Sequence, residues 1–114
     1  MSRREIELYL HDILESILAI EDYVRDINFE GFIEDRKTYS ATIREFEIIG
    51  EAVNQIINEE IIKRHENISW RDIKDFRNLL IHEYFGVDFE IVWNAIFEDL
   101  PPLKTVVKSI LDSK

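Results

Sequence analysis

Cysteine is absent from the sequence, and glycine and proline are scarce, with three and two residues respectively. Without cysteine the chain has no disulfides, no thiolate nucleophile and no cysteine-ligated metal site. Because turns between strands rely on glycine and proline, this scarcity favours long helices with few connections over an all-β fold. Long apolar runs are also missing, since no uninterrupted apolar segment approaches the ~18 residues of a membrane-spanning helix.

The amino-terminal stretch MSRREIELYL is interrupted by charges and lacks the apolar core of a secretion signal. We therefore expect a cytoplasmic protein, and the missing cysteines are compatible with a reducing compartment. Of the 114 residues, 46% are hydrophobic and 33% are charged, which is typical of a soluble globular protein. This length predicts one domain over residues 1–114.

The formal charge of −10 is unevenly distributed along the chain. Residues 1–60 carry 15 acidic and 6 basic side chains, whereas residues 61–114 carry 9 acidic and 8 basic ones. The acidic half is expected to repel polyanions and to suit a basic partner protein. A nucleic acid would have to approach through the second half, which has a weak basic patch. This patch consists of Lys63, Arg64, Arg71, Lys74 and Arg77.

Hydrophobic periodicity predicts an all-α, up-down four-helix bundle with a short C-terminal helical extension. Apolar residues recur at helical spacing over five segments. These are about 3–27, 36–63, 70–84, 89 to the prolines 101 and 102, and 103–111. Residues 28–35 are predicted to form a turn. Suitable N-cap residues precede the helices, and these are Ser2, Ser69, Asp88 and Asp99.

One glycine, Gly50, falls inside the second predicted helix. A glycine in a helix interior costs ~1 kcal/mol relative to alanine. It therefore either is simply tolerated or marks the close approach of another backbone.

The third predicted helix ends in RNLLIHEY, where polar residues interrupt an apolar run. At 100° per residue, Arg77 and Tyr84 lie within about 20° of each other, whereas His82 lies ~140° from Arg77. These side chains do not form a simple dyad on one face. Either the arginine swings round, the helix loosens near its end, or a second subunit completes the site.

Each of these residues also has a structural interpretation. Arg77 could form an ion pair with a carboxylate of the second helix such as Glu51, which shares a flank with Arg44. His82 near a helix C-terminus is favoured there by the helix dipole. Tyr84 could bury its ring and keep its hydroxyl in water.

The same residues could together cleave RNA. A histidine that titrates near neutrality can accept a proton from a ribose 2′-hydroxyl or protonate a leaving 5′-oxygen. An arginine can stabilise the charge that develops on the phosphate, and Asn78 could orient the histidine ring or donate to phosphate. No metal is required, and the three histidines show no metal-ligand spacing.

The spacing Arg77-x4-His82-x-Tyr84 within FRNLLIHEYFGVD resembles the signature of the HepT-like branch of the HEPN superfamily. The likeness extends, in the same order, to IREFEIIGEA at 43–52, ISWRDIKDFRN at 68–78 and EIVWNAIFEDLPPL at 90–103. It thus covers nearly the whole chain. Asp75 departs from the family, which often has a small residue there, and it adds negative charge beside the motif.

The resemblance implies a HEPN-like all-α bundle that dimerises and brings two motifs together across a two-fold cleft. It also implies a metal-independent endoribonuclease without cofactor, the toxin of a toxin–antitoxin pair, acting on RNA such as tRNA. His82 would be the general acid/base, Arg77 the phosphate stabiliser and Asn78 a supporting donor, with Glu51 and Arg44 supporting the site. The antitoxin would be an MntA-like nucleotidyltransferase that transfers AMP to Tyr84, adding charge and bulk.

The alternative is a non-catalytic protein that binds a partner nucleotidyltransferase. The acidic first half of the chain motivates this alternative, because it suits a basic protein surface better than RNA.

Overall fold

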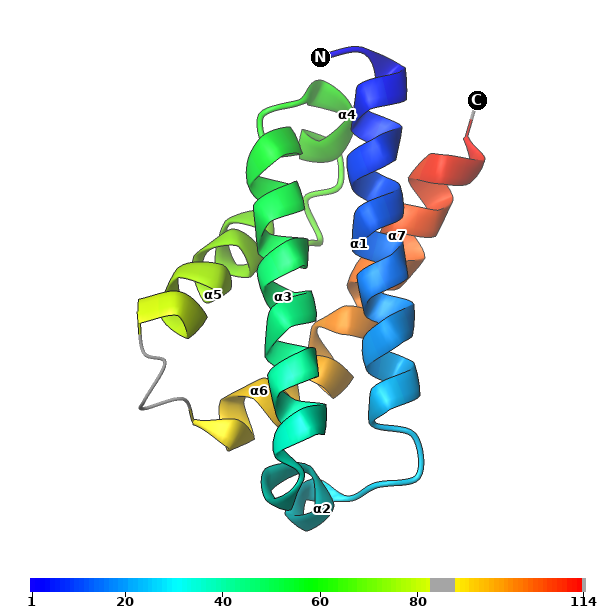
Figure 1. Cartoon of the computed structure of the whole chain (residues 1–114). Coiled ribbons are helices and arrows are strands. Elements are labelled where there is room, and N and C mark those ends of the chain that lie inside the picture. Colours follow the sequence, from blue (N-terminus) through cyan, green and yellow to red (C-terminus); the bar gives the residue numbers. More distant parts are fainter. Residues whose placement is uncertain (83–87, 114) are drawn as a thin grey trace.

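The structure is a computed structural model that describes residues 1–82 and 88–113, and the side chains of all of these except Ile81 and His82. The described residues form helices and no strands, which confirms the all-α prediction (Figure 1). The helices are α1 (Arg3–Tyr23), α2 (Phe29–Glu34), α3 (Arg36–Ile56), α4 (Glu60–Lys63), α5 (Trp70–His82), α6 (Phe89–Glu98) and α7 (Leu100–Asp112).

The centre of the molecule is the antiparallel pair of α1 and α3 (Figure 1). Helix α5 packs on α3, while α7 packs on α1 and α6. An apolar stripe along α1 faces this core, and its buried members are Ile6, Leu10, Ile13, Ile17 and Ile20. Burial of a side chain of this size stabilises the fold by roughly 1.5–3 kcal/mol, so the stripe fixes which face of α1 is inside.

Glu45 of α3 adds a polar connection to this apolar pair. The hydroxyl of Ser16 donates to its Oε1 at 2.9 Å, and that of Tyr23 donates to its Oε2 at 2.8 Å. The bond to Glu45 is the main cause that raises the pKa of Tyr23 above the usual 10.0, because it favours the neutral phenol. Both donors lie on α1, so these two hydrogen bonds fix the position of α1 along α3.

The predicted turn at 28–35 is wrong, because the structure has helix α2 there. Asn28 caps this helix by accepting a hydrogen bond from the N–H of Gly31 at 2.9 Å. Phe32 on its inner face is fully buried. Helix α1 ends at Tyr23 rather than at 27, and Asp26 adopts a positive φ of 67° in the connection to α2. Aspartate tolerates this left-handed conformation better than most residues.

The second predicted helix is shorter than expected, because α3 ends at Ile56 and α4 is a separate short helix. The chain bends over residues 57–59, where the N–H of Glu59 donates to the carbonyl of Ile56 at 3.0 Å. The bend returns the chain toward the bundle, and Ile62 of α4 is fully buried there. Periodicity alone did not show this break, since apolar residues continue through it.

Helix α7 is part of the core rather than an appended extension. Its buried residues are Leu100, Leu103, Val106, Val107 and Ile110. Pro101 and Pro102 lie in its first turn, where a helix does not need their missing N–H groups. The prolines therefore begin a new helix after α6. Among the described residues no helix is long and apolar enough to cross a membrane.

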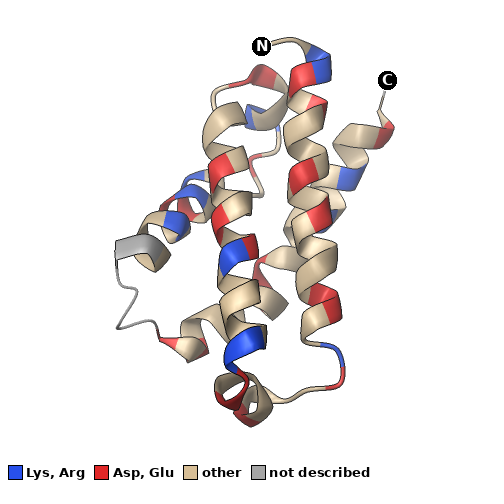
Figure 2. Ribbon diagram, in the orientation of Figure 1, with Lys and Arg blue, Asp and Glu red and all other residues tan. Residues whose placement is uncertain are grey.

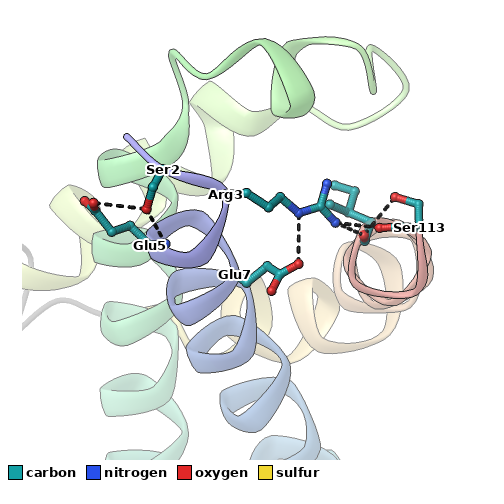
Figure 3. A network of polar contacts seen from close by, with 6 residues as sticks. Ser2, Arg3, Glu5, Glu7 and Ser113 are labelled. Carbon is teal, nitrogen blue, oxygen red and sulfur yellow. Dashed lines mark hydrogen bonds and ion pairs between the residues drawn. The ribbon is translucent and has the colours of Figure 1, made fainter.

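Ser2 and Asp88 act as N-caps, as predicted. Ser2 Oγ accepts from the N–H of Glu5 at 3.1 Å and also donates to the Glu5 carboxylate at 3.1 Å (Figure 3). Asp88 accepts from the N–H of Glu90 at 2.9 Å at the start of α6. Asp99 stands at the N-cap position of α7 but makes no side-chain cap bond, so that part of the prediction is wrong.

Arg3 joins the two ends of the described chain (Figure 3). Its Nη2 donates to the carbonyl oxygens of Ile110 at 2.6 Å and Ser113 at 2.8 Å, and its Nε bonds Glu7 at 2.9 Å. The carbonyls at a helix C-terminus carry partial negative charge and lack intrahelical donors. The guanidinium therefore fastens the last turn of α7 to α1.

An aromatic cluster holds the beginning of α6 against α2 and α3. Its ring pairs have centroids 4.7 to 6.5 Å apart and are tilted or edge-on, which are favourable arrangements. The members are Phe29, Phe32, Tyr39, Phe89, Trp93 and Phe97. This cluster fixes the position of α6 against the rest of the bundle.

Candidate functional site

Helix α5 carries the predicted motif and is anchored at its first residue. The carbonyl of Ser69 accepts from the N–H of Ile73 at 3.1 Å, which places Ser69 at the N-cap position. Trp70 is buried, and its indole N–H donates to the carbonyl of His65 at 3.1 Å. Because the side chain spans the turn before α5, it fixes the direction in which the helix leaves α4.

The buried face of α5 carries apolar residues at helical spacing. Leu80 is fully buried, and Ile73 and Phe76 are packed against the core. The ring of Phe76 meets that of Phe46 on α3 edge-on, with centroids 5.1 Å apart. These contacts set the rotation of α5 about its axis and therefore the direction of Arg77.

Gly50 lets Arg77 lie against α3. A β-carbon built on Gly50 would be 2.5 Å from Cβ of Arg77 and 3.4 Å from its Cγ and Cδ. Real β-carbons essentially never come that close to another atom, so only glycine fits here. A close approach is present as Gly50 suggested, but its partner is the side-chain stem of the candidate catalytic arginine rather than another backbone.

The guanidinium of Arg77 lies over the next residue of α3, Glu51. Its Nη2 is 3.3 Å from Glu51 Oε2, and its Nη1 donates to Asn78 Oδ1 at 3.4 Å. Both distances are long compared with the ~2.7–2.9 Å of a strong charge-assisted bond. The structural ion pair considered for Arg77 is therefore present but weak, and the glutamate side chain is 62% exposed.

Arg77 keeps unused hydrogen-bonding capacity. Its side chain is 32% exposed, and its Nε is buried with no hydrogen-bond partner among the residues the structure describes. A buried N–H without an acceptor costs about 1–3 kcal/mol. The arginine is therefore held by its stem, while the exposed part of its guanidinium makes only long contacts and can still meet an anionic ligand.

Arg44 and Glu51 line one small hollow of about 170 Å³ on the outer side of α1 and α3. Arg44 forms its ion pair with Glu47, at 3.4 Å, and Glu51 turns toward Arg77. Both residues named as supporting groups thus lie near each other, but only Glu51 contacts the candidate catalytic arginine.

The remaining motif residues are only partly described. Asn78 is exposed and accepts from Arg77. His82 is the last residue of α5, five positions after Arg77, and its side chain lies outside the described part of the structure. Tyr84 lies outside the described residues altogether. The roles assigned to His82 and Tyr84 therefore remain predictions.

A larger groove of about 570 Å³ was not anticipated from the sequence. It opens between the first half of α5 and helices α6 and α7, and Asp72, Glu98 and Asp99 line it. Burial raises the pKa of the Asp99 carboxyl above the usual 3.8, and the charges of Glu98 and Asp72 raise it further. The sequence suggested only a capping role for Asp99 and did not show how α5 and α7 cross, so the groove could not be predicted.

No group of His, Asp or Glu side chains suited to a metal ion occurs among the residues that the structure describes. The donors that α5 does bring together are a guanidinium and an amide, carried by Arg77 and Asn78. Guanidinium groups bind phosphate oxygens in fixed geometry. The described part of the site can therefore bind an oxyanion such as a phosphodiester.

Comparison with known proteins identifies relatives over nearly the whole chain. The profile of the family described as Ribonuclease HepT-like matches residues 13–110. A protein of Thermococcus cleftensis named as a probable ribonuclease HepT is 48% identical over 103 residues, covering 90% of this chain and 92% of the relative. A candidate RNase of Methanocaldococcus jannaschii is 37% identical over 110 residues, covering 96% of this chain and all of the relative.

A further relative comes from Caldanaerobacter subterraneus subsp. tengcongensis and is also named as a candidate RNase. It is 39% identical over 106 residues, which cover 93% of this chain and 94% of the relative. No solved structure gives a significant match. The family profile spans α5 together with the helices that position it, so this chain belongs to the Ribonuclease HepT-like family.

Proposed function

We propose that this protein is a metal-independent endoribonuclease and the toxin of a HepT/MntA-type toxin–antitoxin pair. The observation that carries the proposal is Arg77, whose stem rests on Gly50 and whose guanidinium stays partly exposed five residues before His82. Membership of the Ribonuclease HepT-like family supports the same activity. The substrate is RNA, with tRNA the first candidate, and the protein acts in the cytoplasm.

In the proposed reaction, His82 accepts the proton of a ribose 2′-hydroxyl, and the oxygen attacks the adjacent phosphorus. The bond from phosphorus to the 5′-oxygen breaks, and this leaving oxygen takes a proton from a protonated histidine. Arg77 stabilises the additional negative charge on the phosphate oxygens during the displacement. Asn78, which already contacts Arg77, supports the phosphate or the histidine ring.

We propose that two copies of the chain form a homodimer that supplies both histidines. On a straight helix Arg77 and His82 point ~140° apart, so one chain does not direct both side chains at the same phosphate. A two-fold axis close to α5 would place the arginine of one copy near the histidine of the other. One histidine would then act as base and its symmetry mate as acid.

The proposed antitoxin is an MntA-like nucleotidyltransferase that transfers AMP to Tyr84. The modification would place a phosphodiester charge two residues from His82 and so repel the RNA backbone. Mass spectrometry after co-expression tests this part. We expect the mass of AMP to appear on the wild-type protein and to be absent from Tyr84→Phe.

The ribonuclease proposal is tested by incubating the purified protein with total tRNA in EDTA. We expect cleavage by wild type, and a loss of at least about 100-fold in His82→Ala and Arg77→Ala, since general acid–base catalysis contributes 10²–10⁴-fold. Lys108→Ala is the control, because it removes an exposed positive charge outside the basic patch of residues 63–77. Equal cleavage by all four proteins would remove the roles of Arg77 and His82.

The second candidate function is a non-catalytic partner of a nucleotidyltransferase. Two observations favour it: Glu51 partly neutralises Arg77, and acidic positions recur along α1 (Figure 2). Co-purification with a nucleotidyltransferase, without tRNA cleavage by the free protein in any buffer, would select this candidate. Cleavage by the free protein that depends on His82 would exclude it.

A further inference from the structure

The groove of about 570 Å³ lies along the first half of α5, and neither Arg77 nor Asn78 lines it. Asp72 lines the groove in the first turn of α5, ten residues before His82, which is about 15 Å along a helix that rises 1.5 Å per residue. The groove is therefore separate from the candidate RNA site. Its apolar lining comes from four helices and the segment before α5, and consists of Phe46, Ile49, Ile68, Ile73, Phe76, Ile91, Ala95, Leu100, Pro102 and Leu103.

All charged residues that line the groove are acidic, namely Asp72, Glu98 and Asp99. Within the described part of the chain, none of the three carboxylates has a side-chain hydrogen bond or an ion pair in this structure. Asp99 occupies a cap position without using its carboxylate as a cap. Clustered negative charge beside partly desolvated apolar surface attracts a positively charged partner.

The side of α6 that faces the groove exposes apolar surface to water, where that surface adds least to the stability of a soluble protein. Ile91, Asn94 and Glu98 share this face at helical spacing, and the Ile91 side chain is 48% exposed. An exposed isoleucine beside a carboxylate and an amide offers an apolar contact with polar groups around it. This combination is typical of the core and rim of a binding surface.

We infer that this groove binds a short cationic and amphipathic segment of another protein. An arginine or lysine of that segment would pair with Asp72, Glu98 and Asp99, and a neighbouring apolar side chain would lie on Ile73, Ile91 and Leu103. The volume is within the ~300–1,000 Å³ of sites that enclose a small ligand. It therefore suits one or two anchoring side chains rather than a whole helix.

The charge of the groove argues against other occupants. A nucleic acid would bring phosphates next to three carboxylates, which is unfavourable. A second copy of this chain carries the same net charge of −10 and has few basic clusters to offer. A foreign basic segment is the occupant whose charge and apolar content both fit.

Fluorescence anisotropy tests the inference with a labelled synthetic peptide that has arginine and leucine at helical spacing. The same peptide with glutamate in place of arginine is the peptide control. We expect the basic peptide to bind wild type and Asp72→Asn/Glu98→Gln/Asp99→Asn to bind it at least about 10-fold more weakly. The matched variant Glu15→Gln/Glu34→Gln/Asp112→Asn removes the same number of exposed charges elsewhere and should stay within about twofold.

A second pair of variants tests the apolar part of the groove. Ile91→Lys replaces an exposed side chain, so it should fold, and we expect it to abolish binding of the peptide. Leu8→Lys changes an equally accessible leucine on α1 and should leave binding unchanged. If the triple groove variant does not fold, as judged by circular dichroism, this pair decides.

Three results would overturn the inference. One is that the triple groove variant and the matched triple variant bind the basic peptide equally weakly, since binding would then depend on net charge alone. Another is failure of the basic peptide to bind wild type. The third is a change in the sedimentation coefficient of Ile91→Lys, because the groove would then be an interface between copies of this chain. None of these results bears on tRNA cleavage, so the inference and the ribonuclease proposal fail separately.

Discussion

Gly50 of α3 faces Arg77 of α5 so closely that a β-carbon on residue 50 would lie 2.5 Å from Cβ of the arginine. Two helices thus meet at the residue that we propose to stabilise phosphate. Gly50 has no side chain that could take part in a reaction, but the space it leaves determines the position of the Arg77 guanidinium. A residue of α3 therefore determines the geometry of a motif on α5.

We predict that Gly50→Ala destabilises the protein by about 1–2 kcal/mol. Overpacking costs typically 1–3 kcal/mol, and the gain of up to about 1 kcal/mol from better helix propensity offsets part of it. The neighbour is Cβ of Arg77, which moves only if α5 moves. Urea unfolding measures the change. Gln55→Ala, at an exposed position of the same helix, is the comparison, because it adds no atom between α3 and α5. A Gly50→Ala protein as stable as wild type would contradict the close packing.

Glu51→Gln should improve RNA binding while hardly changing stability. The ion pair with Arg77 is exposed and 3.3 Å long, so its loss costs less than about 1 kcal/mol of stability. Under the proposed function the freed guanidinium binds phosphate better, and we expect the KM for RNA to fall by roughly two- to fivefold. Glu34→Gln, an exposed change of the same charge, is the control in cleavage assays. An unchanged or higher KM would show that Glu51 does not compete with substrate.

Stability at high pH should depend on Tyr23. The hydrogen bond to Glu45, followed by burial and the charges of Glu45 and Asp22, raises the pKa of Tyr23 above 10.0. Its contribution is therefore fully present below pH 10 and is lost as the pH rises through the folded-state pKa. Chemical unfolding between pH 8 and 11 should show a steeper loss for wild type than for Tyr23→Phe. Tyr9→Phe, on the same helix, should follow the wild-type curve.

Arg3→Ala should lower the melting temperature by about 4 °C, which corresponds to about 1 kcal/mol for a chain of this size. The guanidinium donates to the carbonyls of Ile110 and Ser113, and such bonds from charged groups contribute more than neutral ones. Arg4→Ala removes the same charge from a neighbouring exposed position and is the control. Equal melting of the two variants would show that the bonds to α7 add nothing.

The sequence was sufficient for features that depend on local periodicity. The stripe from Ile6 to Ile20, the buried face of α5 and the caps at Ser2 and Asp88 follow from spacing and side-chain chemistry, and the structure confirms them. Gly50 could be singled out because a helix interior rarely favours glycine. Arg77 could be singled out because it belongs to the polar residues that interrupt an apolar run. Their mutual contact was not predictable, since it depends on the rotation of α5 against α3.

Features that depend on tertiary packing were missed. Helix α2 and the break after Ile56 lie in segments where polar and apolar residues have no clear period. The path of the chain there depends on the burial of Phe32 and Ile62. The acidic groove likewise arises from the crossing of α5 with α6 and α7. Asp72 and Asp99 are far apart in sequence, and only the fold brings their charges together.

The uneven charge of the molecule has a kinetic consequence. Acidic positions recur along α1, whereas basic positions gather on α5 (Figure 2). A polyanion approaching from a distance is repelled by the whole molecule and attracted only by a small region at close range. Added salt screens the long-range repulsion between the polyanion and the acidic surface more than it weakens the short-range contact with the basic region. Capture of a phosphate chain by this protein should therefore accelerate with moderate ionic strength, the reverse of what a basic nucleic-acid-binding protein shows.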